Sequence, residues 1–389
     1  MRTSALTGPA GLAAAGLTAL ICLTACGATG TVGSSGTTSA APSSGPAAQA
    51  LSAAYKGVVG TPPTEPVPVR KGVKAWVMSC GQELPTCSTS SDAVKEAATA
   101  IGWSTSICDG KLNPQGWAAC IREGTAQHAD VIFVIGQDCS SFEGPLREAR
   151  AAHVTTIGVG SNDCDAQGGE RLFGATTQRF EGMTNQQWWN KLGALQADYL
   201  IGRTGGSAKV LEVTFADSLW GRWIKEGLTD RLATCTGCSI VGELQLTNAD
   251  VASNTIGQKF SSALLKATGA NAVAVPLDPW FLAGISQGIR SSGRSDRLTV
   301  VGGFGQQANL DLIRGGQGED ATIAFDQIWD GWGAVDTALR VLAGQKALPA
   351  GIGLQAVDTG HNLPAAGRPF GYMPTVDFRA LYQKTWTRT

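Results

Sequence analysis

Cys26 is the residue whose position most clearly predicts a covalent modification. It ends an apolar stretch that begins near Leu12, and a basic Arg2 stands at the start of the chain. This layout is typical of a secretory signal, and Leu-Thr-Ala-Cys at residues 23–26 looks like a bacterial lipobox. We therefore expect residues 1–25 to be removed, and Cys26 to carry lipid that anchors the protein to the outer face of the cell membrane. The alternatives are an ordinary cleaved signal and an uncleaved anchor helix.

The other cysteines predict disulfide bonds. The chain has ten cysteines, of which Cys22 would leave with the signal and Cys26 would take the lipid. An even number of cysteines in an exported chain favours disulfides, although their number allows many pairings. The simplest pattern joins neighbours in the sequence, as Cys80–Cys87, Cys108–Cys120, Cys139–Cys164 and Cys235–Cys238.

A metal or redox site is a weaker interpretation of these cysteines. Residues 235–238 form a C-x-x-C motif, but a structural zinc site needs a second pair of ligands. The histidines, His128, His153 and His361, lack the close spacing that would supply it. A redox C-x-x-C should open a helix after a strand, whereas this one lies between an expected helix and the next strand. We expect no metal and no cofactor.

Motifs of enzyme chemistry are weak in this chain. It contains no G-x-G-x-x-G motif, no P-loop, and no histidine placed for a catalytic triad. Residues 163–168 begin like a calcium loop, but its twelfth position is Gly174 rather than glutamate. Asp217 and Asp278 could form an acidic pair across a cleft, at a separation that sequence does not give. We do not expect an enzyme.

The elements that must position any site alternate between strand and helix. Short apolar runs predict buried strands, and runs with apolar residues three and four apart predict helices. The expected strands are residues 75–80, 104–108, 131–135, 154–159, 209–213, 240–246, 272–277, 298–301 and 322–325. The expected helices are residues 91–101, 114–128, 140–153, 185–201, 219–234, 254–268, 280–291, 309–313 and 328–343.

This alternation predicts an α/β fold with two doubly wound parallel-sheet lobes, split near residues 175–205. Ligands in such folds bind beyond the carboxyl ends of the strands, which here would face a cleft between the lobes. Residues 26–70 are rich in Gly, Ser, Thr, Ala and Pro and are expected to form a flexible linker. The net charge of −1 gives no indication of a nucleic-acid partner.

Several stretches resemble one known family. Residues 129–135 followed by 146–154 are similar to its third strand, helix and fourth strand, and residues 223–228 to the helix after its first C-lobe strand. Residues 298–304 and 321–324 resemble its last two C-lobe strands. The family is that of the extracytoplasmic sugar-binding proteins of ABC transporters, of the ribose and galactose type (type I periplasmic binding proteins).

The resemblance covers roughly residues 72–345 and implies two lobes that close on a ligand. It implies that the chain crosses between them near residues 175–180, again near 326, and once more after about 350. The N-terminal lobe would then hold residues 71–178 and about 327–350. The C-terminal lobe would hold residues 179–326 and about 351–389.

The ligand residues of the family match this chain in part. The resemblance aligns Arg222 with an arginine that binds ligand, and a guanidinium is a forked donor to carboxylates or hydroxyls. Asp278 stands where the family carries Asn-Asp, although an aspartate before Pro279 also suits a helix N-cap. Residues 160–161 replace an Asp-Arg pair and residues 303–305 a Phe-Asp pair, which puts a simple pentose or hexose in doubt.

Aromatic and polar side chains near the carboxyl ends of strands complete the predicted site. Aromatic faces pack against the C–H groups of sugars or against aromatic ligands, although they also fill cores. Amide, hydroxyl and carboxylate groups could bind a polar ligand. The predicted ligand-binding residues are Gln137, Asp138, Ser161, Asn162, Trp220, Arg222, Asp278, Trp280, Phe304, Phe325 and Asp326.

These observations together favour a lipid-anchored, monomeric solute-binding protein. It would capture a small polar solute, such as a sugar, in the cleft and deliver it to an ABC transporter permease. A sensor that presents its bound state to a membrane receptor is the first alternative. A surface hydrolase that uses an acidic pair is the second.

Overall fold

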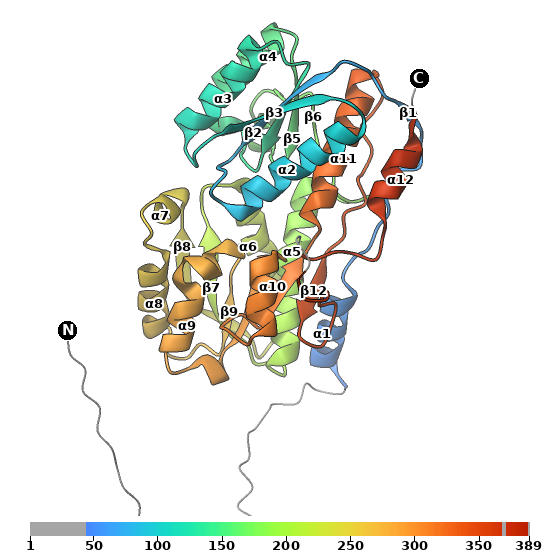
Figure 1. The fold of residues 1–389 in the computed structure, drawn as a ribbon. Coiled ribbons are helices and arrows are strands. Elements are labelled where there is room, and N and C mark those ends of the chain that lie inside the picture. The colour runs from blue at the N-terminus through green and yellow to red at the C-terminus, as the bar shows by residue number, and fades with distance from the viewer. Residues whose placement is uncertain (1–43, 368–370, 388–389) are drawn as a thin grey trace, which may run out of the picture. The chain divides into compact units, whose positions relative to one another are not determined.

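The computed structural model describes residues 44–367 and 371–387. Cys26, the predicted signal and the first part of the predicted linker lie outside the described residues. The fold has two lobes, each a twisted sheet between helices, which confirms the predicted α/β class (Figure 1). Among the described residues, no helix combines the length and hydrophobicity needed to cross a bilayer.

The N-terminal lobe is built on a parallel sheet in the order β3-β2-β4-β5-β6. Its strands are β2 (Lys74–Ser79), β3 (Ser104–Asp109), β4 (Val131–Ile135), β5 (Thr155–Val159) and β6 (Ala175–Thr176). Helices α3 (Pro114–Ala126) and α4 (Glu143–Ala151) cover one face, and α2 (Pro85–Ala100) and α11 (Gln327–Leu342) the other (Figure 1). Strand β4 is wholly apolar because both its faces are buried: Ile132 and Val134 pack toward α3 and α4, and Phe133 packs toward α2 and α11.

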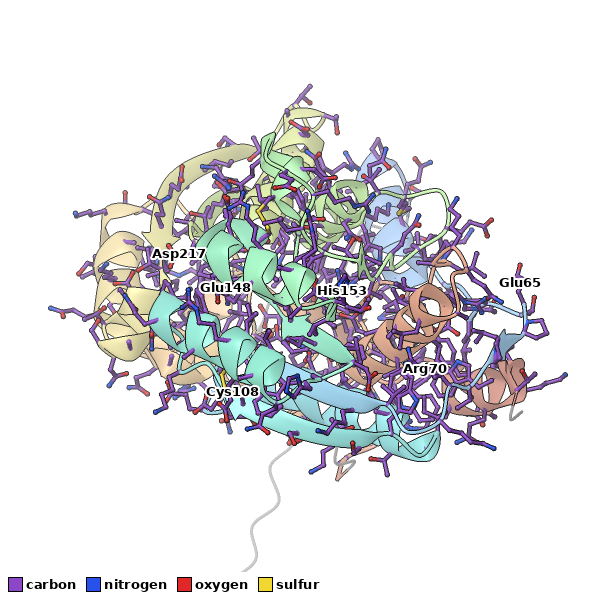
Figure 2. The ribbon with its side chains drawn as sticks, turned by 90° about the horizontal axis from the view of Figure 1, so that it is seen from above. Glu65, Arg70, Cys108, Glu148, His153 and Asp217 are labelled. Atoms are coloured by element: carbon purple, nitrogen blue, oxygen red, sulfur yellow. A yellow bond between two sulfur atoms is a disulfide. The ribbon has the colours of Figure 1, made fainter. Side chains whose placement is uncertain are left out.

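The outer pair of helices in this lobe is joined at its surface. The Arg122 side chain on α3 donates two hydrogen bonds to the carboxylate of Glu148 on α4, at 2.8 and 3.0 Å (Glu148 is labelled in Figure 2). Both side chains are about half exposed, so water screens the attraction between their charges. The pair therefore adds little to the stability that the buried apolar face of α4 already gives.

The C-terminal lobe is built on a six-stranded sheet in the order β12-β11-β10-β9-β7-β8. Its strands are β7 (Lys209–Phe215), β8 (Ser239–Leu246), β9 (Ala272–Ala274), β10 (Thr299–Phe304), β11 (Ala321–Ala324) and the antiparallel β12 (Gln355–Asp358). Its helices are α5 (Asn185–Arg203), α6 (Leu219–Ala233), α7 (Asn248–Ala252), α8 (Ile256–Lys266), α9 (Ser286–Ser291) and α10 (Gln307–Arg314). A helical turn over Phe281–Ile285, which contains Gly284 at a φ of 122°, precedes α9.

Helices α5 and α6 pack against each other at glycines. A Cβ atom on Gly193 of α5 would lie 1.9 Å from the carbonyl oxygen of Ile224, and one on Gly227 of α6 would lie 1.9 Å from that of Asn190. No side chain fits at such a distance, so these positions set how closely the two backbones approach.

Three segments join the lobes between β6 and β12, and the chain passes between the lobes again near each of its ends. Residues 177–184 lead from β6 to α5, residues 325–326 lead from β11 to α11, and residues 343–354 lead from α11 to β12. Helix α11 packs on α2 and β5 and so belongs to the N-terminal lobe, although it follows a strand of the other lobe. The carboxyl ends of the strands of both sheets consequently face each other across the boundary.

Residues 46–56 differ from the predicted flexible linker. They form helix α1 (Pro46–Lys56), which packs on α5 and buries Ala50, Leu51 and Ala54. Leu51 lies against the backbone of α5 at Gly202, where a side chain would collide with it. The prediction was wrong here because it rested on composition, whereas a few apolar residues on one helical face suffice when a partner surface is available.

The C-terminal tail also differs from the expectation that residues 351–389 lie with the C-terminal lobe. Strand β12 does, but α12 (Phe378–Thr385) packs on α11, and β13 (Trp386–Thr387) pairs in parallel with β1 (Val67–Pro68). The Trp386 ring stacks on Trp332 of α11 at 5.2 Å between ring centroids, and its Nε1 donates to Asp336 at 2.9 Å. This burial of an aromatic side chain holds the tail on the N-terminal lobe.

Four disulfides link the eight cysteines in the sequential order. Their Cα–Cα distances are 5.5 Å for Cys80–Cys87, 5.6 Å for Cys108–Cys120, 5.1 Å for Cys139–Cys164 and 5.3 Å for Cys235–Cys238. Cys108 is labelled in Figure 2. The first three lie in the N-terminal lobe and the fourth in the other, so none of them ties one lobe to the other.

Candidate functional site

A cavity of about 60 Å³ lies between the two lobes. The N-terminal lobe contributes the disulfide Cys80–Cys87, the start of α2 and the ends of β4 and β5, and the C-terminal lobe contributes the ends of β7 and β10. Its lining includes the side chains of Leu84, Thr86, Ser90, Leu112, Ile135, Gln137, Val159, Arg179, Trp189, Phe215, Trp220, Asn248, Leu277, Phe304, Phe325, Gln327 and Asp330. Ligand pockets are usually several hundred Å³ in volume, so the lobes are closed on each other here.

Aromatic rings form one wall of the cavity. Trp189 lies 5.4 Å from Trp220 and 5.7 Å from Phe304, measured between ring centroids. Phe304 in turn lies 5.0 Å from Phe325, and Phe215 lies 5.0 Å from Trp220. The rings come from α5, α6 and the ends of β7, β10 and β11, so folding of the C-terminal lobe brings them together.

An ion pair lies at the base of the cavity, where the chain crosses between the lobes. The Arg179 Nη2 atom donates to Asp330 Oδ2 at 2.6 Å, and both side chains are at least 95% buried. The guanidinium lies 4.8 and 4.7 Å from the ring centroids of Trp188 and Trp189. These rings stabilise a desolvated cation through their negative faces.

The sequence analysis missed both members of this pair. Arg179 follows the two-residue strand β6, which it did not predict, and Asp330 was read as part of an ordinary helix. The one available signal was a pair of oppositely charged residues in or beside the expected crossing segments.

Asp138 binds the other lobe rather than facing the cavity. Its Oδ2 accepts hydrogen bonds from the Leu219 backbone N–H at 2.7 Å and from the Ser218 hydroxyl at 3.3 Å, at the start of α6. Its Oδ1 accepts from the Asn162 side chain at 2.8 Å. Burial raises the pKa of Asp138, and these hydrogen bonds act in the opposite direction. The carboxylate therefore caps a helix of the C-terminal lobe from the N-terminal lobe.

Of the predicted ligand-binding residues, Gln137, Trp220, Phe304 and Phe325 line the cavity. Arg222 does not: it is exposed, because it lies on the outward face of α6 one position beyond the inward Gly221. Its placement rested on resemblance alone.

Three further predicted residues have structural roles. The Ser161 hydroxyl donates to the carbonyl oxygen of Val134 at 2.9 Å, and Asn162 orients Asp138. Trp280 is buried in the C-terminal lobe, with its ring 5.6 Å from that of Phe215. These residues support the walls of the cavity and are not among its lining residues.

Asp278 lies below the cavity in a fully buried polar cluster. Its Oδ2 accepts from the backbone N–H groups of Gly305 and Gln306 at 2.7 and 3.0 Å. Its Oδ1 accepts from the Thr322 hydroxyl at 3.0 Å. Asp278 thus fixes the turn that follows Phe304, whose φ is 103°, and positions that ring in the cavity wall.

A second buried carboxyl group, Glu319, faces Asp278. Asn309 Nδ2 donates to Glu319 Oε2 at 2.6 Å. Burial raises the pKa of Asp278 to about 7, while burial and the charge of Asp278 raise that of Glu319 well above its usual range. A Cβ on Gly302 would lie 2.3 Å from Glu319 Oε1 and 2.5 Å from Asp278 Oδ1, so only glycine leaves room for the pair. Two carboxyl groups this close repel each other when both are ionised, so a proton on one of them stabilises the pair.

Asp326 caps helix α11 at the edge of the cavity. Its Oδ1 accepts from the backbone N–H groups of Ile328 and Trp329 at 2.8 and 3.1 Å, and burial raises its pKa to about 6. Asp326 lines a second, outer pocket of about 370 Å³, which shares Phe304, Phe325 and Gln327 with the cavity. Tyr372 of the C-terminal tail lines this outer pocket as well.

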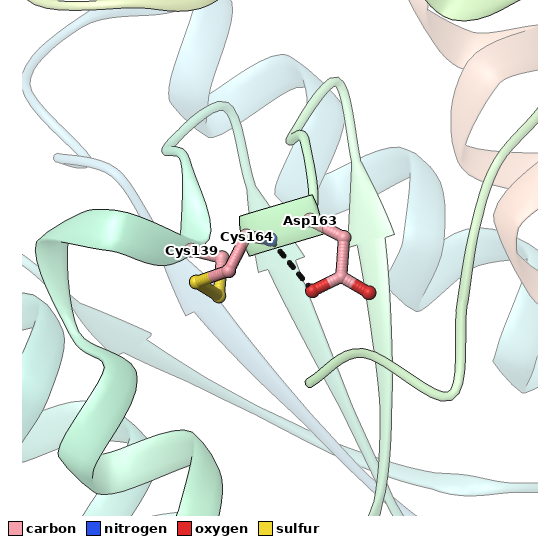
Figure 3. A group of neighbouring side chains, drawn as sticks. All are labelled: Cys139, Asp163 and Cys164. Carbon is pink, nitrogen blue, oxygen red and sulfur yellow. Dashed lines mark hydrogen bonds between the residues drawn. A yellow bond between two sulfur atoms is a disulfide. The ribbon is translucent and has the colours of Figure 1, made fainter. Parts of the chain in front are cut away.

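Cys139, Asp163 and Cys164 lie together but do not form a metal site (Figure 3). The two sulfur atoms are bonded to each other, so neither offers a thiolate. Asp163 Oδ1 accepts from the backbone N–H groups of Cys164 and Leu172, each at 2.8 Å. The carboxylate therefore organises the loop that the sequence analysis compared with a calcium site.

The pattern G-x-S-x-G occurs once, at residues 284–288, and is not a nucleophile elbow. Ser286 is the first residue of α9 and follows helical backbone, whereas an elbow places the serine on a sharp strand-to-helix turn. His128, His153 and His361 all lie outside the segment from β7 to α10 that contains it.

Comparison with known proteins agrees with this architecture. The sequence profile described as "Periplasmic binding protein domain" matches residues 79–346. The chain belongs to this family. Members of the family bind solutes and are not enzymes, in agreement with the sequence analysis. Comparison with curated protein sequences gave no significant match.

Solved structures share the fold at low sequence identity. The arabinose-binding component of an ABC transporter from Shewanella sp. ANA-3 has a TM-score of 0.60 and 17% identity, over 73% of this chain and 91% of that one. A myo-inositol binding protein from Caulobacter has a TM-score of 0.63 and 18% identity, over 78% of this chain and 98% of that one. A solute-binding protein from Mycobacterium smegmatis with bound glycerol has a TM-score of 0.59 and 20% identity, over 77% of this chain and 99% of that one.

Proposed function

We propose that this protein captures a small neutral solute of the sugar or polyol kind between its lobes and delivers it to an ABC transporter permease. The observation that carries the proposal is the cavity that both lobes line, with aromatic rings on one wall and the buried Arg179–Asp330 pair at its base. Rings of this kind pack against the C–H faces of a sugar ring. The structural relatives with bound arabinofuranose, myo-inositol and glycerol support this class of ligand.

Closure of the lobes is the binding step in this proposal. The cavity is too small for a sugar to enter while Asp138 caps α6, so the lobes must first open about the segments that connect them. A solute that contacts both lobes then favours the closed state, because its affinity for that state is higher.

A thermal-shift screen tests the proposal. The exported protein carrying Cys26→Ser, which cannot be lipidated, is screened against sugars, polyols, nucleosides, amino acids and organic acids. A ligand that binds only the folded state raises the melting temperature by mass action. We expect a shift with one class of neutral solute, abolished by Trp220→Ala and retained by the exposed control Arg222→Ala. A well-folded protein with no shift for any solute would reject solute capture.

We also propose that Cys26 carries the lipid anchor and that the protein lies on the outer face of the membrane. Mass spectrometry of the mature N-terminus checks this, with a diacylglycerol-modified Cys26 as the expected result. Cys26→Ser should move the protein from the membrane fraction to the soluble fraction, whereas Cys22→Ser should leave it in place.

A further inference from the structure

The walls of the interlobe cavity are apolar on both sides. The N-terminal lobe presents Leu84, Leu112, Ile135 and Val159 beside the disulfide Cys80–Cys87. Opposite them stand Phe215, Trp220, Leu277, Phe304 and Phe325, with Trp189 at the hinge. A bound molecule would therefore contact carbon or sulfur over most of its surface. Burial of apolar ligand surface against these walls is favourable at about 25 cal/mol per Å².

Several polar side chains of the cavity already have partners within the protein. Arg179 is bonded to Asp330 at 2.6 Å. Gln327 accepts a hydrogen bond from Gln306 at 2.6 Å, and its own amide donates to Ser90 at 3.4 Å. These groups would have to give up a bond inside the protein to bind a ligand hydroxyl.

Other polar groups of the cavity remain available to a ligand. Among the described residues, the side chains of Thr86, Gln137 and Asn248, which come from both lobes, form no hydrogen bond. At the base, the Nε atom of Arg179 and the Nε1 atom of Trp189 are buried donors without an acceptor. The Oδ1 atom of Asp330, which also lines the cavity, is a buried acceptor without a donor. Unsatisfied buried polar atoms are costly, so the base of the cavity favours a ligand that brings a group able both to accept and to donate, such as a single hydroxyl.

The cavity also carries no net charge. Its charged lining residues are Arg179 and Asp330, which neutralise each other. A charged ligand would be buried there without a counter-charge, at a large desolvation cost. The site thus favours a neutral molecule.

We infer, given the proposed function, that the ligand is a neutral ring compound with few hydroxyl groups, such as a 6-deoxy sugar or a nucleoside, rather than a fully hydroxylated hexose. Each hydroxyl that is buried against an apolar wall without a partner costs about 1–3 kcal/mol. A methyl group, a ring C–H face or a heteroaromatic ring in the same place gains from burial. The aromatic wall and the apolar side chains of the N-terminal lobe opposite it favour the same class of ligand.

Matched ligand pairs test this inference on the Cys26→Ser protein by calorimetric titration. The pairs are D-galactose with D-fucose, L-galactose with L-fucose, and L-mannose with L-rhamnose, each a hexose and its 6-deoxy form, with adenosine and inosine as a separate arm. We expect a 6-deoxy sugar to bind at least about ten-fold more tightly than its parent, or a nucleoside to bind more tightly than any hexose.

The outcomes separate the inference from the proposed function. If a hexose binds as tightly as, or more tightly than, its 6-deoxy partner and both nucleosides, the inference is wrong and solute capture stands. If no neutral or charged solute binds the folded protein, both are wrong. Leu277→Asn adds a polar group to the apolar wall and should shift the preference toward the parent hexose, whereas Arg222→Ala should leave the ratio of affinities unchanged.

Discussion

The Arg179–Asp330 pair shows how a buried charge depends on its partner. Both groups are held away from water, and each lacks a partner for one further atom, Nε on Arg179 and Oδ1 on Asp330. Removal of one charge leaves the other buried and uncompensated. The pair is therefore more important for keeping the cleft intact than its single hydrogen bond suggests.

We predict that Arg179→Met lowers the free energy of unfolding by about 3–5 kcal/mol, because Asp330 becomes an isolated buried carboxylate. Urea unfolding followed by tryptophan fluorescence measures the change. The double variant R179M/D330L should recover much of the loss. Arg222→Ala, an exposed change, should stay within about 0.5 kcal/mol of the unmodified protein. A small effect of Arg179→Met would show that water reaches the pair in solution.

The carboxyl pair Asp278 and Glu319 predicts how stability depends on pH. Both pKa values are raised in the folded state, so the folded protein binds more protons than the unfolded chain. Stability therefore falls as pH rises from the usual carboxylate range through about 7, where Asp278 ionises beside Glu319.

We predict that Glu319→Gln weakens this dependence, because the amide keeps a bond to Asn309 and can donate to Asp278 without a proton from solution. Melting temperatures at about pH 5 and about pH 8 provide the measurement. The decrease in melting temperature between the two pH values should be smaller in Glu319→Gln. The exposed change Glu83→Gln should leave that decrease as it is in the unmodified protein. An unchanged fall would assign the titration to other buried acids, such as Glu212, whose pKa burial raises to about 7.

For individual residues, the sequence predicted side chains that lie at strand ends. It did not predict those whose role depends on contacts with residues far away in the sequence. Phe304 and Phe325 follow apolar strands, and the ends of such strands meet at one edge of a sheet. Arg179 has no such local signal, because its environment is made by Trp188, Trp189 and Asp330 from other parts of the chain. The prediction for Arg222 was wrong because a shift of one residue along a helix turns a side chain by about 100°.

Among the elements, α5 and α6 depend most strongly on residue size. Gly193→Ala should destabilise the protein by about 2–3 kcal/mol, because its Cβ would overlap the backbone of Ile224. Gly144→Ala is the matched control: Gly144 lies in α4 with open space around it, and alanine favours helix there by up to about 1 kcal/mol. Chemical denaturation of both variants compares them. Equal stabilities would mean that α5 and α6 can move apart freely.

The strands were easier to predict than the elements at the two ends of the chain. Strand β4 is a continuous apolar run, and a run of this kind indicates burial on both faces of the strand. Helices α1 and α12 are short and carry few large apolar side chains, so each is stable only on a surface that another part of the chain provides. Sequence alone does not show that surface.

In the whole molecule, we expect the hydrogen bonds of Asp138 across the lobes to affect the equilibrium between open and closed forms. Asp138→Ala removes the cap on α6 and should shift the ligand-free protein toward more open forms, since a charge-assisted hydrogen bond contributes about 1.5–3 kcal/mol. Small-angle X-ray scattering should record a larger radius of gyration, and a saturating ligand should reverse it. Arg222→Ala should scatter as the unmodified protein does. An unchanged radius in Asp138→Ala would mean that other contacts hold the lobes together.

The order of the disulfides bears on how the chain acquires its structure. The paired cysteines are 7, 12, 25 and 3 residues apart, and no pair encloses another. A chain that emerges from a translocation channel with its N-terminus first therefore completes each pair before the next cysteine appears. Short loops also close at the smallest entropic cost. Oxidation can thus proceed stepwise behind the moving chain, with the correct partner always the nearest free thiol and little need for a disulfide isomerase.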